Sequence, residues 1–272
     1  MDITTILGIV IALGGIVGGY IMESHGGIAK ALAALWSPTA APIILGGTIG
    51  AVLVSFPLNE LKLIGSMFKA IFFNKKLNEV QTIQTMVRFS EIARKEGLLA
   101  LEGEVAKIKN PLIEKGLKLI IDGTESQTTK DILSWDMHLQ NDVFMRGSKL
   151  FAAAGGFSPT MGIIGTVMGL ITVLAGNLED PAELAKGIAT AFIATLYGVS
   201  LANLLWLPFE NKIKVKASRQ RLINELIIEG VLSIQAGDHP DTVRDKMSLA
   251  YFEKSSGKKA AAAPKSAAEE EK

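Results

Sequence analysis

The chain has 272 residues, 49% of them hydrophobic and 20% charged, and its mean hydropathy of +0.33 is high for a soluble domain. It has no cysteine and three scattered histidines, which excludes a disulfide framework and thiolate chemistry and argues against a metal site within one chain. The net charge of +1 indicates no particular partner, because the charged residues are segregated along the chain.

Four stretches carry no charged residue: Ile3–Met22, Ala31–Asn59, Leu150–Leu178 and Gly187–Phe209. Each is long enough for a membrane-spanning helix, which needs about 20 apolar residues. The first stretch has no Lys or Arg before it, so it is predicted to be an uncleaved span rather than a signal peptide. We therefore expect an all-α integral membrane protein with four transmembrane helices.

Basic residues indicate the orientation of these spans. Of the 28 Lys and Arg residues, 14 lie between Asn59 and Lys149 and 12 follow Phe209. Because Lys and Arg accumulate on the cytoplasmic side, the long middle segment and the C-terminal segment are predicted to face the cytoplasm. With four spans, the N- and C-termini are then both cytoplasmic.

The same pattern divides the chain into five segments. Residues 1–57 hold the first two spans, 58–149 form a helical cytoplasmic domain, and 150–209 hold the third and fourth spans. Residues 210–253 are predicted to form cytoplasmic helices. Residues 254–272, rich in Lys, Ala and Glu, are predicted to be a disordered tail.

Glycines within the spans suggest where helices meet. Gly14 and Gly18 in the first span are four residues apart, as are Gly46 and Gly50 in the second. This spacing places small residues on one helix face and allows close approach of a neighbouring backbone.

The cytoplasmic segment shows helical periodicity. Val80, Ile83 and Val87 are spaced to share one helix face, with charged residues on the other. Pro111 follows Asn110 at a break in the pattern, and proline suits the first turn of a new helix.

No enzyme motif is present, and none of the four predicted spans contains Asp, Glu, Lys, Arg or His. A chain that conducted ions alone would be expected to carry such a group. The third and fourth spans offer hydroxyls instead, at Thr166, Thr172, Thr190, Thr195 and Ser200. Because an α-helix rises about 1.5 Å per residue, Thr166 and Thr195 are expected to lie at similar depth in the membrane. They either line one polar layer or bond back to their own helices.

A charged cluster lies in the cytoplasmic stretch ARKEGLLALEGEV, which contains Arg94 and Glu102. Taken alone, it is a solvated helix surface, where charges serve docking more than stability.

The order of two spans, a long cytoplasmic segment, two spans and a basic tail resembles the MotA/PomA family of flagellar stator subunits. So do the stretches FSPTMGIIGTVMGL, ATLYG and IIEGVLSIQAGDHP. The resemblance implies a non-enzymatic subunit of the bacterial inner membrane that couples inward ion flow to torque. It implies a homo-pentamer around a dimer of a MotB-like partner, whose single span supplies the ion-binding aspartate. Neither a cofactor nor a nucleic-acid partner is expected.

The resemblance also assigns roles to residues. Thr166 and Thr195 correspond to threonines beside the ion path, and Pro159 and Pro208 to functional prolines at its inner mouth. The pair Arg94 and Glu102 corresponds to charges that engage the rotor protein FliG. The translocated ion stays open between H⁺, which the family favours, and Na⁺, for which the threonine oxygens would be ligands.

Two other classes remain as alternatives. An ExbB- or TolQ-like subunit uses related ion-driven chemistry, but that family typically has three spans and an external N-terminus. A solute transporter working alone would be expected to carry a binding residue at mid-membrane or an internal repeat, and neither is evident.

Overall fold

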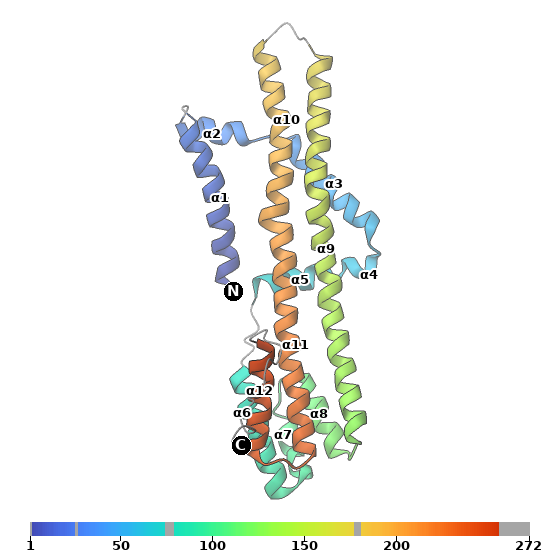
Figure 1. The fold of residues 1–272 in the computed structure, drawn as a ribbon. Coiled ribbons are helices and arrows are strands. Elements are labelled where there is room, and N and C mark those ends of the chain that lie inside the picture. Colours follow the sequence, from blue (N-terminus) through green and yellow to red (C-terminus); the bar gives the residue numbers. More distant parts are fainter. Residues whose placement is uncertain (1, 25–26, 74–78, 177–180, 256–272) are drawn as a thin grey trace, which may run out of the picture. The chain divides into compact units, whose positions relative to one another are not determined.

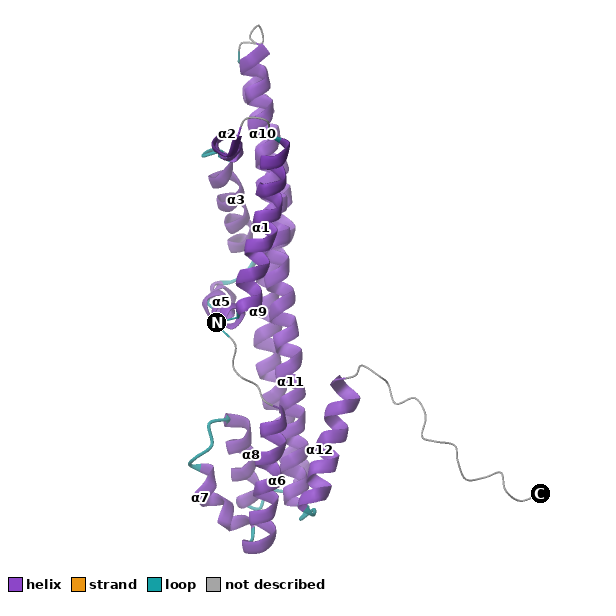
Figure 2. Cartoon of the chain, turned by 90° about the vertical axis from the view of Figure 1, so that its left-hand side faces the viewer, coloured by secondary structure: helices purple, strands orange, loops and turns teal. Residues whose placement is uncertain are grey.

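The computed structural model describes residues 2–24, 27–73, 79–176 and 181–255 (Figure 1). Every regular element in these ranges is a helix, which confirms the predicted all-α fold (Figure 2). Residues 254–255, the start of the predicted tail, are helical, and the rest of the tail, from residue 256 onward, lies outside the described residues.

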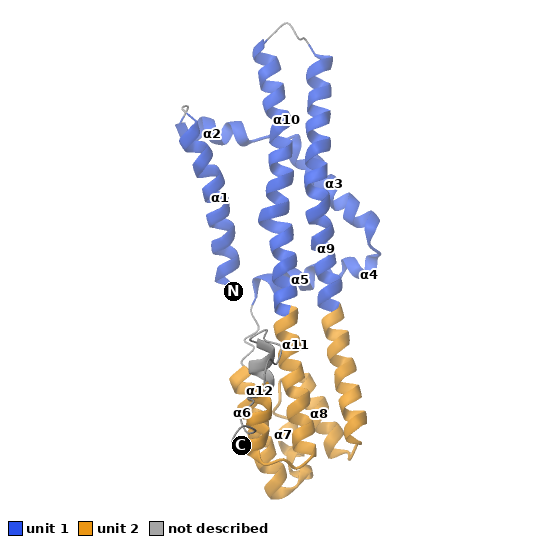
Figure 3. Cartoon of the chain, viewed as in Figure 1, with its two compact units in different colours: residues 1–75, 143–216 blue, residues 76–142, 217–272 orange. Residues whose placement is uncertain are grey.

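The helices are listed here in chain order. They are α1 (Ile3–Glu23), α2 (Gly27–Leu35), α3 (Ala40–Ser55), α4 (Leu58–Leu61), α5 (Leu63–Phe72), α6 (Glu79–Glu96), η1 (Leu98–Leu101), α7 (Glu102–Val105), α8 (Pro111–Ile121), α9 (Ser126–Ala175), α10 (Pro181–Leu201), η2 (Ala202–Trp206), α11 (Leu207–Gln235) and α12 (Pro240–Ser255). They form two compact units, residues 1–75 with 143–216 (unit 1) and residues 76–142 with 217–272 (unit 2) (Figure 3). Helices α9 and α11 contribute residues to both units.

Among the described residues, three helical runs are long and apolar enough to cross a membrane: α1, α9 and the continuous run Pro181–Gln235. Helices α2 and α3 pass the same test only as a pair bent by 41°. Pro38 lies in the break between them, where its fixed φ and missing N–H disfavour a continuous helix. The predicted count of four spans therefore holds only if this bent pair is one span.

Within unit 1, α9 and α10 are packed through very small residues. A Cβ atom added at Gly162 of α9 would lie 3.0 Å from the carbonyl oxygen of Ala194 on α10. One added at Gly198 would lie 2.6 Å from the carbonyl oxygen of Ser158. These backbones can approach so closely only because neither glycine carries a side chain.

The glycine pairs predicted to mediate contacts of the first two spans make no close contact with another described part of the chain. A Cβ atom added at Gly14, Gly18, Gly46 or Gly50 would meet nothing within 4 Å, and α1 contains no buried residue. The contact on α3 is made instead by Gly47, beside the Met161 side chain. Spacing identified a small-residue face but not which face meets a neighbour.

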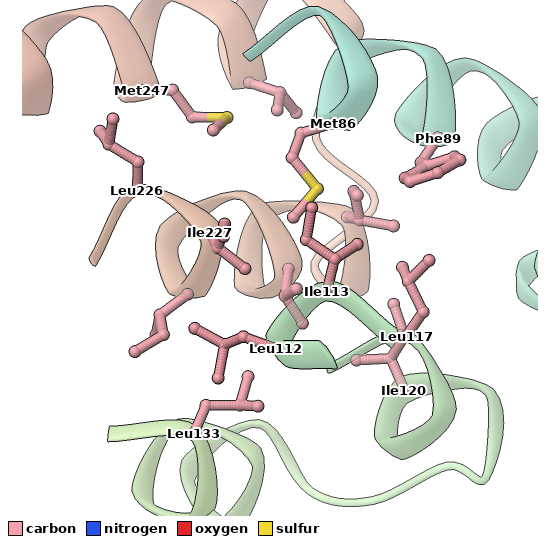
Figure 4. Packing of buried hydrophobic residues seen from close by; sticks show 14 of the residues in the cluster. Met86, Phe89, Leu112, Ile113, Leu117, Ile120, Leu133, Leu226, Ile227 and Met247 are labelled. Carbon is pink, nitrogen blue, oxygen red and sulfur yellow. The ribbon is translucent and has the colours of Figure 1, made fainter. Parts of the chain in front are cut away.

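Unit 2 is built around large apolar side chains from α6, α8, α9, α11 and α12 (Figure 4). Its fully buried members include Met86, Leu117, Leu133, Leu226 and Ile227. Removing such a side chain from water into a protein interior stabilises the fold by roughly 1.5–3 kcal/mol, so the hydrophobic effect stabilises this unit.

Local predictions for unit 2 are mostly confirmed. Pro111 is the first residue of α8, and the Asn110 side chain accepts a hydrogen bond from the Leu112 N–H at 3.0 Å. On α6, Val87 is buried and Ile83 packs against the core, but Val80 is 62% exposed. The prediction that Val80 shares the buried face was therefore wrong, because the side chains of α6 that face the core begin one turn later, at Ile83.

Candidate functional site

The structure brings Thr166 on α9 and Thr195 on α10 into contact, and their hydroxyl oxygens lie within hydrogen-bond distance of each other. The Thr166 Oγ1 atom also lies 3.1 Å from the carbonyl oxygen of Gly162 and 3.0 Å from that of Ala191. Both side chains are half-buried. A hydroxyl has one hydrogen and two lone pairs, so this pair can satisfy its donors and still accept from water or coordinate a cation.

A second polar contact lies along the same hairpin. The Ser158 hydroxyl of α9, fully buried, donates to the carbonyl oxygen of Gly198 at 2.9 Å. Hydroxyl-to-backbone bonds of this kind link α9 to α10 at both positions. Among the described residues, no cluster of three or more His, Asp or Glu side chains is placed to hold a metal ion.

The two predicted prolines lie in turns that contact each other. Pro159 is inside α9 and cannot donate to the carbonyl of Gly155, four residues earlier. A Cβ atom added at Gly155 would lie 2.5 Å from the Leu207 side chain, which immediately precedes Pro208. The weakened turn of α9 therefore packs against the turn that carries the second proline.

Pro208 does not interrupt its helix. The π-helical turn Ala202–Trp206 lies directly before it, and the helical run continues to Gln235. Wider π turns shift the backbone hydrogen bonds, and this lets a proline without an N–H enter a continuous helix. The irregular backbone hydrogen bonds of the π turn therefore lie at the junction of α10 and α11.

A buried ion cluster at the start of α1 was missed by sequence reasoning. Asp2 is 6% exposed and pairs with Lys212 Nζ at 2.7 Å and Lys216 Nζ at 3.2 Å, both on α11. Lys216 also donates to the carbonyl oxygen of Ala70 at the end of α5, at 2.6 Å. The only sequence signal is that the two lysines are four residues apart and share a helix face.

This cluster shifts the Asp2 titration. Burial by itself raises the pKa of the Asp2 carboxyl, but hydrogen bonds from Lys212, Thr4 and Lys216 outweigh it. The pKa is consequently held well below its usual range, so Asp2 is ionised at every physiological pH.

Arg94 and Glu102 both lie exposed on unit 2. Arg94 is in the last turn of α6 and Glu102 is the first residue of α7, and no ion pair of either is found among the described residues. Between them Gly97 has φ +87, a conformation that strongly favours glycine, so the turn that separates the two charges depends on it.

One neighbouring carboxylate on unit 2 is paired. Glu104 forms ion pairs with Arg88 and with Lys107, the latter at 2.8 Å. The Lys107 ammonium, followed by the Arg88 guanidinium, holds the pKa of Glu104 below its usual value. Glu102, two residues before Glu104, differs from it in being exposed and in having no ion pair among the described residues.

Comparison with known families gives two matches. A family described as the MotA/TolQ/ExbB proton channel family matches residues 104–226, and one described as Motility protein A N-terminal matches residues 6–97. Motility protein A of Bacillus subtilis (strain 168) is 34% identical over 248 residues, covering 91% of this chain and 90% of that protein.

Two solved structures share the fold. One is described as the structure of C. jejuni MotAB, with a TM-score of 0.86 and 26% identity, covering 92% of this chain and 96% of that chain. The other is the flagellar MotAB stator complex from Bacillus subtilis, with a TM-score of 0.83 and 34% identity, covering 90% and 94%.

Proposed function

The chain belongs to the MotA family of flagellar stator proteins, and on this premise we propose that it converts inward ion flow into torque on the flagellar rotor. The family is one of channels rather than enzymes. The site residues discussed above then have roles in ion passage, in coupling and in docking, not in bond-making chemistry.

The observation that carries this proposal is the Thr166–Thr195 contact in a hairpin whose charge-free runs contain no Asp, Glu, Lys, Arg or His. Such a hairpin offers oxygen ligands but no group that can bind and release a proton. We propose that the single span of a MotB-like partner supplies an aspartate at this level. The two solved relatives are named as MotAB complexes, which supports a partner of this kind.

Neutralisation of the partner's carboxylate would drive the cycle. A charged carboxylate in a low-dielectric site is costly, so binding of H⁺ or Na⁺ changes which face of the surrounding subunits it prefers. We favour H⁺ as the translocated ion and no resident cofactor. We also propose a homo-pentamer around a partner dimer, so that each ion passage advances the ring by a step.

The proline contact is proposed as the point where this step reaches the cytoplasmic helices. Pro159 weakens α9, and Pro208 follows the π turn that joins α10 to α11. A helix bends more easily where its backbone hydrogen bonds are missing or shifted than where they are regular. Movement near the Thr166–Thr195 pair can therefore change the direction of α11.

The orientation follows the basic residues. We propose that the chain lies in the bacterial inner membrane with both termini in the cytoplasm, because the segments rich in Lys and Arg then face inward. The exposed Arg94 and Glu102 would then be free to engage the rotor protein FliG through charge complementarity.

The test uses a strain that lacks its own stator genes and expresses this chain with its partner. Thr195→Val keeps the side-chain shape but removes the hydroxyl, so the complex should assemble while swimming speed and ion flux fall. Thr160→Val is the matched control, because the Thr160 hydroxyl only donates to the Phe157 carbonyl of its own helix, at 2.7 Å. If Thr195→Val swims normally at every sodium concentration, the threonine pair is not part of the ion path.

A further inference from the structure

Three helical segments of unit 1 meet around Asp2: the start of α1, the end of α5 and the first turns of α11. Asp2 immediately precedes α1, and its backbone N–H donates to the carbonyl oxygen of Phe72 on α5 at 2.8 Å. Its carboxylate pairs with Lys212 and Lys216 of α11 and accepts a hydrogen bond from the Thr4 hydroxyl at 2.7 Å. The start of α1 is therefore bonded to both of the other helices.

Lys216 connects α11 to the end of α5. Its ammonium donates to the carbonyl oxygens of Ala70 at 2.6 Å, Ile71 at 3.3 Å and Phe73 at 3.4 Å. The last carbonyls of a helix have no partner within it, and the negative end of the helix dipole favours a cation there. Lys216 thus holds α11 against α5, while Asp2 supplies the opposite charge.

The cluster is largely shielded from water. Asp2 is buried, and the side chains of Lys212 and Lys216 are only 20% and 22% exposed. Ile71 on α5 and Ile213 on α11 belong to one apolar cluster and are completely buried. A low effective dielectric strengthens each attraction, and separating the partners would leave a poorly solvated charge. The contact therefore resists being pulled apart.

The contact also lies at a distinctive place in the chain. Lys212 and Lys216 follow Pro208 by about one and two helical turns, directly beyond the π turn. The chain passes between unit 1 and unit 2 three times, once shortly after Phe73 and once directly after Lys216. The bonds of Lys216 to the end of α5 therefore hold two of these three passages together.

We propose that Asp2 is a positioning residue of the motor, which forms an ionic clamp with Lys212 and Lys216 and makes α5 and the start of α1 follow any change in the direction of α11. The inference rests on the proposed function and adds the element that carries movement from the Pro208 turn to two connections with unit 2. Without the clamp α11 would bend alone, and part of the movement would not reach unit 2. Loss of the clamp then lowers the torque obtained for a given ion flux and leaves the ion path unchanged.

Distances between spin labels test the clamp in the purified complex with its partner. The chain has no cysteine, so Ser66→Cys on α5 and Val215→Cys on α11 provide the two labelling sites, and both residues are exposed. An excess of unlabelled chain ensures that most complexes carry a single labelled copy. Electron paramagnetic resonance then gives the distribution of α5–α11 distances within one chain.

Asp2→Asn and Lys212→Gln should each broaden this distribution, because each removes one partner of the ion pair. Lys214→Gln is the matched control and should not, because Lys214 lies between the two clamp lysines and pairs with Glu210 on its own helix. Exchanging the charges, with Asp2→Lys and Lys212→Asp in one chain, should narrow the distribution again. The exchange keeps the attraction between the start of α1 and α11, so recovery reports a direct coupling.

Motility separates positioning from a merely structural role. A structural contact would lower assembly, ion flux and swimming speed together, whereas the clamp predicts wild-type flux per complex with reduced speed in Asp2→Asn, and recovered speed in the exchanged pair. Unchanged distances in both Asp2→Asn and Lys212→Gln, or flux and speed that fall in proportion, would overturn the clamp and leave the stator function intact. A wild-type complex without ion flux would instead overturn the proposed function, and with it the role of the clamp.

Discussion

The α9/α10 hairpin of unit 1 and the core of unit 2 achieve close packing by opposite means. In the hairpin, the contacts are made by glycine, alanine and hydroxyl groups, with Gly198 against the backbone of Ser158. In unit 2, large side chains such as Leu117 and Ile227 are completely buried. Both regions are helical, so secondary structure does not explain the difference.

The surrounding solvent explains it. Leu174 and Ile171 on α9 are 67% and 60% exposed, which is unremarkable in lipid because lipid tails are as apolar as leucine. Because lipid provides no hydrophobic driving force between helices, their association is stabilised by close packing of the backbones and by hydrogen bonds across the interface. In unit 2, by contrast, the burial of apolar surface makes the largest favourable contribution to stability.

The largest effect is expected from a cavity in unit 2. Leu117→Ala should reduce the free energy of unfolding by about 2–5 kcal/mol, because it removes transfer energy and leaves a void. Leu99→Ala is the control, since Leu99 is 72% exposed. Hydrogen exchange of α8 amides measures the loss. Equal exchange in both variants would show that unit 2 does not depend on its buried leucines.

A smaller effect is expected from overpacking the hairpin. Gly198→Ala brings a methyl group against the Ser158 carbonyl and should cost about 1–3 kcal/mol, with impaired assembly and motility. Gly156→Ala is the matched control on α9, because a Cβ there meets nothing within 4 Å. Melting temperatures of the two purified complexes provide the comparison. A Gly198→Ala complex as stable as the control would contradict the close approach of α9 and α10.

The Asp2 cluster joins parts of unit 1 by charge rather than by small residues. Asp2→Asn should cost about 1–2 kcal/mol, because charge-assisted hydrogen bonds from Lys212 and Lys216 are lost. The folded-state pKa of Asp2 lies below its unfolded value, so this contribution is complete above the unfolded pKa. It is lost only as pH falls through the folded pKa.

The pH dependence provides the measurement. The melting temperatures of the wild type and Asp2→Asn should differ by the same amount from pH 8 down to about pH 5 and converge only below about pH 4, the unfolded range of Asp. Convergence already near neutral pH would show that another group, not Asp2, controls this junction.

The smallest stability effect belongs to the exposed surface of unit 2. Arg94→Glu should change the free energy of unfolding by no more than about 1 kcal/mol, because exposed charges contribute little. Torque should nevertheless fall, and a reciprocal charge reversal on the rotor protein should restore part of it. Lys130→Glu is the control, an exposed lysine of the same unit. Swimming speed in these strains decides whether Arg94 contacts the rotor.

The sequence predicted features that depend on local composition. Charge-free runs predicted the apolar helices, Pro111 predicted the start of α8, and helical rise predicted that Thr166 and Thr195 lie at one level. These follow from residue spacing alone, because a helix fixes the axial position of each residue.

Features that depend on tertiary neighbours were not predictable. Asp2 and Lys212 are far apart in the sequence, and nothing local couples them. Gly47, not Gly46 or Gly50, makes the contact on α3, because spacing does not reveal which face meets α9. The π turn before Pro208 likewise has no sequence signature, since a proline alone predicts only a break.

The four predicted spans of this chain offer threonine oxygens but no Asp, Glu, Lys, Arg or His, and we propose that a partner completes the channel. Ion flux into vesicles tests it with three preparations: this chain alone, the chain with its MotB-like partner, and the chain with a partner whose span aspartate is changed to asparagine. We expect flux only in the second preparation, with the first and third at background. Robust flux through vesicles that contain this chain alone would contradict it.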